Sequence, residues 1–251
     1  MDSFQVEWEL FPGYDPENPS TKQAILERVS NFQKANLGKC IHRMFEADNL
    51  GKSKIAMNTG YQEAKKFFAA GVSLFDGGCG FGSDLRRAIL DSADPKAAIG
   101  MTWDPREIEW GFELYGDKGM PLHSGSYIVG DLRSIPLPER SIDIAFSRSV
   151  IHTMPTKADA SQYLKEIRRI LRPPVGIFFG STGGCKSEHD NKEIMRYATS
   201  QESLKELLES LGFRQVEVSA STSKQKAVFG TTSNPGSRDV FDMHINFFAR
   251  L

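Results

Sequence analysis

A glycine-rich stretch, VSLFDGGCGFGS at residues 72–83, constrains the fold of this chain more than any other feature. Apolar residues lead into Asp76, glycines follow at positions 77, 78, 80 and 82, and a helical pattern begins near Asp84. Glycine permits positive φ angles and lets the backbone approach a ligand closely. The stretch therefore predicts a buried strand, a tight turn and the N-terminus of a helix, where free N–H groups can meet a ligand.

Strand-like and helix-like runs alternate after residue 71. This alternation predicts an α/β fold with a parallel sheet and right-handed crossovers. The chain ends differently, because two strand-like runs follow each other there with no helix between them. Consecutive strands are naturally antiparallel, so we expect one antiparallel strand at or near the sheet edge. The strand-like runs are 72–76, 97–102, 126–130, 142–147, 175–181, 212–221 and 239–251, and the helix-like runs are about 83–92, 105–115, 158–171 and 201–211.

Residues 1–70 are interpreted as an N-terminal helical cap on a core domain of residues 71–251. A helix is predicted from Ser20 to Phe45, with apolar residues on one face, and a second one at about 61–69. The GKSK run at residues 51–54 is not a phosphate loop, because that motif needs a glycine where this chain has Glu46.

Composition excludes several classes of function. Lys and Arg number 31 and Asp and Glu 32, and this balance predicts no binding of nucleic acid or of an anionic membrane surface. No apolar run approaches the roughly 20 residues of a membrane span. The acidic N-terminus lacks the pattern of a secretion signal, and the three cysteines form no CxxC pair, which together predict a cytoplasmic protein. No ligand cluster has the spacing of a metal site.

The ligand of the glycine turn can be narrowed from the residues around it. The dinucleotide fingerprint GxGxxG fits poorly, and a pyrophosphate would be repelled by Asp76 at the turn. The alternative pattern DxGxGxG is met by Asp76, Gly78, Gly80 and Gly82. It suits a ligand with an amine and a ribose and without phosphate.

At this point the chain resembles the class I S-adenosylmethionine-dependent methyltransferases. The glycine turn is similar to their first motif, and three later stretches match further family motifs in the same order. The second and third of these later stretches also resemble the small-molecule subgroup of the ubiquinone and menaquinone type. This resemblance implies a Rossmann-like sheet of order 3-2-1-4-5-7-6 with the last strand antiparallel, and S-adenosyl-L-methionine as cofactor. The three stretches are GDLRSIPLPERSIDIAFSRSVIH (130–152), EIRRILRPPVGIFF (166–179) and SQESLKELLESLGFRQVEV (200–218).

By this resemblance Asp76, Gly78 and Gly80 line the methionine and ribose part of the cofactor. Cys79 contributes through its backbone, since a reactive thiol would need a basic neighbour. Gly82 either lines the cofactor or allows close helix–strand packing.

The second strand departs from the family pattern. Thr102 stands where the family has an acid that holds the ribose hydroxyls. Asp104 either reaches the ribose in its place or caps the next helix, since Pro105 and Glu107 follow it as in a capping sequence. Trp103 either covers the adenosine or packs in the core.

Further roles follow from the resemblance. Asp131 is expected to accept from the adenine amine, with the Leu132 backbone N–H beside it. Ser147 and Arg148 end the fourth strand, where Arg148 would approach the methionine carboxylate or an acidic substrate. Tyr61 matches a tyrosine that closes over the cofactor in several family members, and otherwise packs in the cap.

The expected reaction is methyl transfer from S-adenosylmethionine to a small-molecule acceptor through O, N or C. In-line transfer needs chiefly alignment, and a general base only for a poor nucleophile. His152 is the candidate base. Aromatic residues of the cap favour an apolar or aromatic acceptor. A homodimer is a possible assembly. The alternatives are a protein of this fold that binds the cofactor but catalyses a cyclisation or elimination, and a non-catalytic binding protein.

Overall fold

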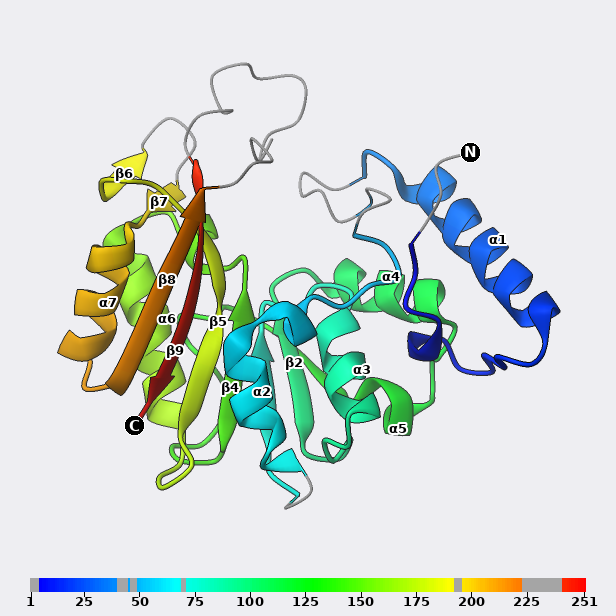
Figure 1. Cartoon of the computed structure of the whole chain (residues 1–251), viewed down its shortest axis with the longest axis horizontal. Coiled ribbons are helices and arrows are strands. Elements are labelled where there is room, and N and C mark those ends of the chain that lie inside the picture. The colour runs from blue at the N-terminus through cyan, green and yellow to red at the C-terminus, as the bar shows by residue number, and fades with distance from the viewer. Residues whose placement is uncertain (1–4, 40–44, 46–48, 69–70, 192–195, 223–240) are drawn as a thin grey trace.

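The computed structural model describes residues 5–39, 45, 49–68, 71–191, 196–222 and 241–251. A seven-stranded sheet runs through the molecule in the order β3-β2-β1-β4-β5-β9-β8 (Figure 1). Its strands are β1 (Leu74–Gly77), β2 (Ala98–Thr102), β3 (Ser126–Val129), β4 (Ile144–Arg148), β5 (Ile177–Gly184), β8 (Arg214–Thr222) and β9 (Met243–Arg250).

The sheet topology confirms the predicted fold class. Strands β1 to β5 pair in parallel, whereas β9 is antiparallel to both of its neighbours, β5 and β8. The antiparallel strand thus lies one place in from the edge. The carboxyl ends of the parallel strands meet at one end of the sheet, the upper end in Figure 1. That end carries the glycine turn.

The helices begin where the sequence offers capping residues. Side chains of Asn18, Asp104, Thr156 and Ser200 each accept a backbone N–H at the start of a helix, satisfying a donor that the helix itself leaves unpaired. The helices are α1 (Pro19–Asn36), α2 (Thr59–Lys65), α3 (Ser83–Leu90), α4 (Pro105–Tyr115), α5 (Pro121–Ser124), α6 (Lys157–Ile170) and α7 (Gln201–Ser210).

The first helix is shorter than predicted. The expected helix over 20–45 ends at Asn36, and Gly38 takes a φ of +86°, a left-handed conformation that stops a right-handed helix. Residues 40–44 of that prediction lie outside the described residues. The prediction was wrong over 37–39 because apolar spacing alone does not register a glycine stop.

Two apolar layers cover the sheet. On one face α2 and α3 pack on Ile144 and Phe146, and on the other α6 and α7 pack on Phe75 and Ala145. Helix α2 belongs to the first layer, because Tyr61 is buried against strand residues. One continuous apolar cluster therefore crosses the boundary predicted at residue 70.

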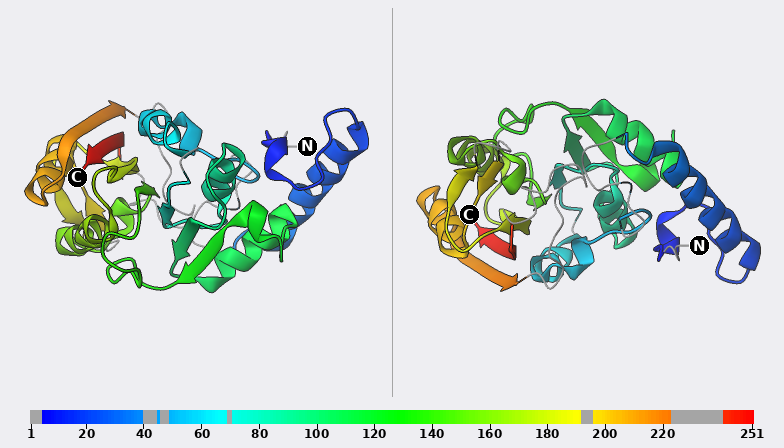
Figure 2. Two further views of the ribbon diagram at one scale, coloured as in Figure 1. Left: turned by 90° about the horizontal axis from the view of Figure 1, so that it is seen from below. Right: turned by 90° about the horizontal axis from the view of Figure 1, so that it is seen from above.

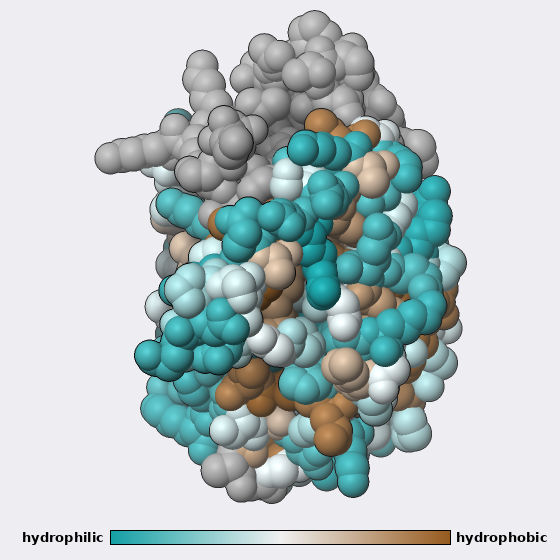
Figure 3. All heavy atoms as spheres, turned by 90° about the vertical axis from the view of Figure 1, so that its right-hand side faces the viewer, coloured by the Kyte–Doolittle hydropathy of each residue, from teal (hydrophilic) through white to brown (hydrophobic). Residues whose placement is uncertain are grey.

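A third cluster joins the N-terminal segment to the end of the sheet. Val29 and Phe32 of α1 pack with Phe81 and Leu114, and the Arg28 Nη1 atom donates to the Tyr115 carbonyl at 3.0 Å. Helix α1 stands at one end of the molecule, beyond α4 (Figure 2). The face on that side is largely hydrophilic, with apolar residues in separate patches (Figure 3).

One hairpin was not predicted. It consists of β6 (His189–Asn191) and β7 (Arg196–Ala198), and residues 192–195 between them lie outside the described ones. Its strands are too short and too polar to give an alternating signal.

In the described part of the chain, no helix has the length and apolar character needed to cross a membrane.

Candidate active site

Three left-handed glycines shape the turn after β1. Gly78, Gly80 and Gly82 have φ angles of +84°, +53° and +72°. The backbone N–H groups of Gly78 and Cys79 donate to the Met101 carbonyl at 2.8 and 3.0 Å, which fastens the turn to the end of β2. A Cβ on Gly78 would lie 2.2 Å from the Val150 Cγ2 atom, so that only glycine fits there.

Asp76 is the most unusual side chain at this turn. Its carboxylate is 2% exposed, and its Oδ2 atom makes no hydrogen bond to any residue that the structure describes. Burial raises the pKa of Asp76 well above its ordinary value, the nearby Asp84 carboxylate adds to the rise, and Arg148 opposes it. A buried carboxylate without a donor is unfavourable on its own, so this position is suited to a ligand that brings an ammonium or hydroxyl group.

Arg148 and Asp84 form a second charged pair beside Asp76. The Arg148 Nε atom donates to Asp84 Oδ2 at 3.0 Å, and the other carboxylate oxygen accepts the backbone N–H groups of Lys54 and Ile55 at 2.6 and 2.9 Å. Asp84 thus ties the N-terminal segment to the first turn of α3. The Arg148 side chain remains 33% exposed at the carboxyl end of β4.

Ser147 lies at the same strand end but on the opposite face of the sheet. It pairs in register with Gly77, whose missing Cβ would lie 2.4 Å from the Tyr163 hydroxyl. The Ser147 Oγ atom and the Tyr163 hydroxyl are both buried on this face. The structure therefore places Arg148, and not Ser147, on the Asp76 side of the sheet.

The end of β2 holds a carboxylate that sequence reasoning assigned to another role. The Thr102 hydroxyl donates to the Glu107 Oε2 atom, and both side chains are buried. Burial raises the pKa of Glu107. The Glu107 carboxylate also adds to the rise in the pKa of Cys79, which places it close to the glycine turn. An acid therefore does stand at the end of β2, supplied from the first turn of α4.

The Asp104 side chain caps the N-terminus of α4. Its Oδ1 atom accepts the Arg106 backbone N–H at 2.9 Å, and its Oδ2 atom pairs with the Arg106 guanidinium at 2.6 Å. These Arg106 contacts lower the pKa of Asp104. Of the two roles considered for Asp104, the structure shows the cap. Trp103, between Thr102 and Asp104, is 64% exposed, so its ring is open to a ligand and does not pack in the core.

The turn after β3 carries Asp131 and Leu132. Both Asp131 carboxylate oxygens contact the Arg133 side chain, Oδ1 also accepts the Arg133 backbone N–H at 2.8 Å, and these contacts lower the pKa of Asp131. Leu132 lies next to the glycine turn, since its Cδ1 atom is 3.9 Å from the position of a Cβ on Gly78. Leu132 and the glycine turn thus come together, while Asp131 faces its own turn and a guanidinium.

His152 is buried in a short 3-10 helix, Ile151–Thr153. Its Nδ1 atom accepts the Gly183 backbone N–H at 3.0 Å and lies 3.0 Å from the Thr182 hydroxyl, and its ring meets Phe241 edge-on. A backbone N–H can only donate, so Nδ1 carries the lone pair and the neutral ring holds its proton on Nε2. In this form Nδ1 is not available as a base toward a substrate.

Tyr61 lies away from the glycine turn, whereas Cys79 lies within it. Tyr61 is fully buried, packs on Phe68 and Phe179, and donates its hydroxyl to Asp91 at 2.8 Å. Asp91 caps the C-terminal end of α3, whereas the glycine turn precedes its N-terminal end, so the structure does not bring Tyr61 to the other predicted residues. Burial raises the pKa of the Cys79 thiol well above its ordinary value, with Asp76 as the next cause, and a thiol in that state is a poor nucleophile.

The aromatic cap residues mostly serve the core. Phe11, Phe45 and Phe68 are buried, whereas Met57 is 82% exposed. Among the described residues, no group of three or more His, Cys, Asp or Glu side chains is arranged to hold a metal ion. The site that emerges is a glycine turn flanked by two buried carboxylates, one exposed tryptophan and one arginine.

Comparison with known proteins identifies a methyltransferase domain around this glycine turn. Residues 75–179 match a family model described as a methyltransferase domain. No curated protein matches the chain at the level of sequence. The fold is that of a class I methyltransferase. The match covers the glycine turn, the end of β2, both Asp131 and His152, and β4.

Solved structures share this fold at low sequence identity. The cyclase SpnF is 17% identical with a TM-score of 0.57, covering 96% of this chain and 98% of its own. A putative sarcosine dimethylglycine methyltransferase from Galdieria sulphuraria is 13% identical with a TM-score of 0.56, covering 89% of this chain and 98% of its own.

Phosphoethanolamine N-methyltransferase 2 from Haemonchus contortus, solved in complex with S-adenosyl-L-methionine, is 17% identical with a TM-score of 0.55. The similarity covers 72% of this chain and 48% of that one, so the matched region is about half of that enzyme. These likenesses extend the methyltransferase fold over most of the chain.

Proposed function

We propose that this chain binds S-adenosyl-L-methionine at the glycine turn and transfers its methyl group to a small-molecule acceptor. The observation that carries the proposal is the buried Asp76 carboxylate, whose Oδ2 atom has no donor among the described residues, beside a turn of three left-handed glycines. The cofactor supplies the missing donors through its ammonium and hydroxyl groups. When bound, its sulfonium supplies an already activated methyl group.

The surrounding residues suit the other parts of such a cofactor. Glu107 together with Thr102 would accept from the ribose hydroxyls, in place of the acid that the family carries in the strand itself. Trp103 and Leu132 would cover the faces of the adenine ring, since one is exposed and the other adjoins the turn. Arg148 would meet the methionine carboxylate with the part of its guanidinium that does not contact Asp84.

The chain's contribution to the reaction is alignment of the acceptor and exclusion of water, since displacement at the activated methyl needs no acid. His152 does not serve as base through Nδ1, because that atom already accepts the Gly183 N–H. The acceptor is therefore a group that is nucleophilic without His152 Nδ1 or that is deprotonated by another residue. A near-neutral chain favours a small molecule over nucleic acid as the acceptor.

A second candidate function rests on one specific likeness. The structural match to the cyclase SpnF extends over almost the full length of both chains. A protein of this fold can thus catalyse a cyclisation. Release of S-adenosylhomocysteine in the presence of candidate acceptors separates the two functions, because only methyl transfer produces it.

Calorimetry with S-adenosylmethionine tests the cofactor site. We expect Asp76→Asn to weaken binding about ten-fold or more, because a charge-assisted hydrogen bond in a buried site is lost. Asp94→Asn is the matched control, since Asp94 lies before β2 at the opposite end of the sheet, where its Oδ1 atom accepts the Lys96 N–H. Equal affinity of wild type and Asp76→Asn would overturn the assignment.

The pH dependence gives a second readout from the same protein. Because the pKa of Asp76 is raised, its carboxyl must lose a proton to bind a cationic group. Affinity should therefore rise with pH through that raised pKa, and binding should release a proton, seen as a dependence of the binding enthalpy on the buffer. In Asp76→Asn both effects should shrink, leaving only the smaller contribution of Glu107.

A further inference from the structure

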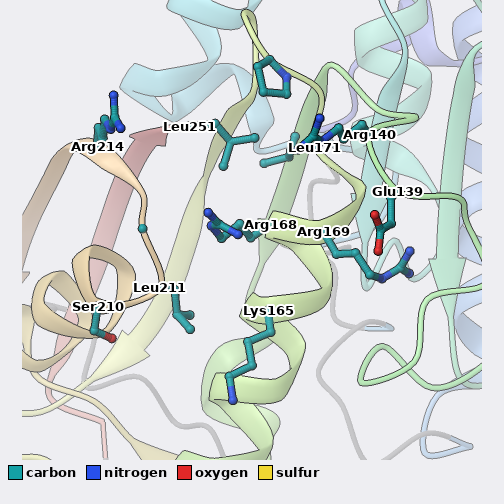
Figure 4. Close-up of a pocket in the computed structure, with 12 residues that line it drawn as sticks. Glu139, Arg140, Lys165, Arg168, Arg169, Leu171, Ser210, Leu211, Arg214 and Leu251 are labelled. Atoms are coloured by element: carbon teal, nitrogen blue, oxygen red, sulfur yellow. The ribbon is translucent and has the colours of Figure 1, made fainter.

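A hollow of about 650 Å³ lies at the end of the sheet opposite the glycine turn (Figure 4). Its walls come from the C-terminal half of α6, the end of α7, the start of β8 and the loop before β4. These are the amino ends of the parallel strands, so the hollow is separate from the candidate active site. Its volume is within the range of small-molecule sites.

The hollow is strongly basic, although the chain as a whole carries a net charge of −1. Its lining has one acidic side chain, Glu139, against five basic ones, which are Arg140, Lys165, Arg168, Arg169 and Arg214. Arg169 pairs with Glu166 at 2.8 Å. The other four make no side-chain hydrogen bond or ion pair with any residue that the structure describes.

Two of these residues lie close to neighbouring backbone. The Arg168 guanidinium lies against the turn between α7 and β8, where a Cβ on Gly212 would be 3.2 Å from its Nε and Nη2 atoms. Arg140 has a left-handed φ of +51°, and its backbone N–H donates to the Arg169 carbonyl at 2.9 Å. In Figure 4 Arg168 extends toward the β8 side, while Glu139 and Arg169 lie together on the other side.

Neutralising a helix end does not account for this arrangement. Cations in the last turn of α6 offset the partial negative charge of that helix end, which explains Arg168 and Arg169. Arg140 and Arg214 come from a loop and a strand, and both line the same hollow. The hollow also has an apolar part, provided by the partly exposed side chains of Leu211 and Leu251.

We propose that this hollow binds a phosphate monoester or diphosphate carried on an apolar body. Guanidinium groups match phosphate in geometry and charge, and the leucine side chains suit an apolar portion. An open hollow lined by four segments suits a small anion better than the flat surface of an acidic protein. The proposal stands independently of the activity proposed above.

Calorimetry with inorganic pyrophosphate and with 1-naphthyl phosphate tests the proposal on the whole chain. Saturating S-adenosylhomocysteine is present, so that the site at the other end is occupied. The double variant Arg168→Gln/Arg214→Gln should bind both probes about ten-fold or more weakly than wild type, because two charge-assisted contacts are lost. The control Lys34→Gln/Lys118→Gln removes the same charge from distant surface positions and should bind like wild type.

Two further arms identify the source of the phosphate. Vesicles of phosphatidylcholine with and without phosphatidic acid are sedimented with wild type and double variant. Co-sedimentation that needs phosphatidic acid and is lost in the double variant assigns the phosphate to a lipid headgroup, and binding of the soluble probes alone assigns it to a metabolite. Equal binding of the probes by wild type and double variant, or binding of polyglutamate with no binding of either phosphate probe, overturns the proposal.

Discussion

At the scale of single residues, two acids three positions apart at the end of β2 are in opposite states. Asp104 sits beside the Arg106 guanidinium, which lowers its pKa, whereas Glu107 is buried and its pKa is raised. The first is an ionised helix cap. The second is a buried carboxylate that a hydroxyl or ammonium donor would stabilise. The Thr102 hydroxyl already donates to one of its oxygens.

This contrast yields a prediction for cofactor affinity. Glu107→Gln keeps the shape of the side chain and its contact to Thr102 but removes its charge. It should weaken binding of S-adenosylhomocysteine about ten-fold, as expected for a charged acceptor lost from a ribose contact. Isothermal calorimetry measures the affinity.

The control for this experiment is Glu109→Gln on the same helix. Glu109 is exposed and pairs with Lys118 at 2.6 Å, so its substitution should leave the affinity unchanged. If Glu107→Gln and Glu109→Gln both bind like wild type, Glu107 is only a structural partner of Thr102 and the ribose is held by other groups.

The residue scale is also where sequence reasoning reached its limit. The glycine turn, Asp76 and the departure at Thr102 were all visible in the sequence. Glu107 was read as part of a capping sequence, because the direction of its side chain depends on how α4 leaves β2. For His152 the tautomer depends on Gly183, which is far away in the chain and adjacent only once β5 is in place.

At the scale of elements, the glycine turn places two demands on one residue. Gly78 combines a left-handed backbone with the close approach of Val150, and these are separate constraints. The chain contains a matched position that has only the first one. Gly119 has a φ of +83°, and a Cβ placed on it would meet nothing within 4 Å.

Gly78→Ala and Gly119→Ala should therefore differ sharply. Both incur the strain of a positive φ in alanine, about 1 kcal/mol. Only Gly78→Ala must also displace Val150, and with it the turn that faces the ligand. We expect S-adenosylhomocysteine binding to be lost in Gly78→Ala and kept in Gly119→Ala, measured by calorimetry on folded protein. Similar affinity in both variants would show that the turn tolerates a Cβ.

The order of the elements was predictable, and their ends less so. Alternating runs and the two consecutive terminal strands are enough to indicate the sheet, because period and order are local properties of the sequence. The end of α1 depends on a single glycine, and the β6–β7 hairpin consists of strands of only three residues. Such features carry little sequence signal.

At the scale of the whole molecule, the N-terminal segment and the sheet share their apolar clusters. Tyr61 and Phe68 pack with Phe179, and Phe32 packs with Phe81. Asp84 adds a polar link through the backbone of Lys54 and Ile55. Elements that share a core in this way are expected to unfold together.

Equilibrium unfolding tests this cooperativity. Urea transitions followed by tryptophan fluorescence, which includes Trp8 near α1, and by far-ultraviolet circular dichroism should coincide. Two separated transitions would contradict this expectation and support a separate cap of residues 1–70. Ala64→Gly is a useful comparison, because it weakens α2 inside the shared cluster and should shift both signals equally.

The position of β9 bears on the order in which the protein is made. This strand is translated after β8, yet it lies between β5 and β8 and forms the ladders of both. During synthesis β5 therefore has an open edge and β8 has no partner until residues 243–250 leave the ribosome. If the other six strands fold before β9 is made, two unpaired strand edges face each other across a gap of one strand. A strand from another chain can enter that gap, so slow synthesis of residues 243–250 favours pairing between chains over closure of the sheet.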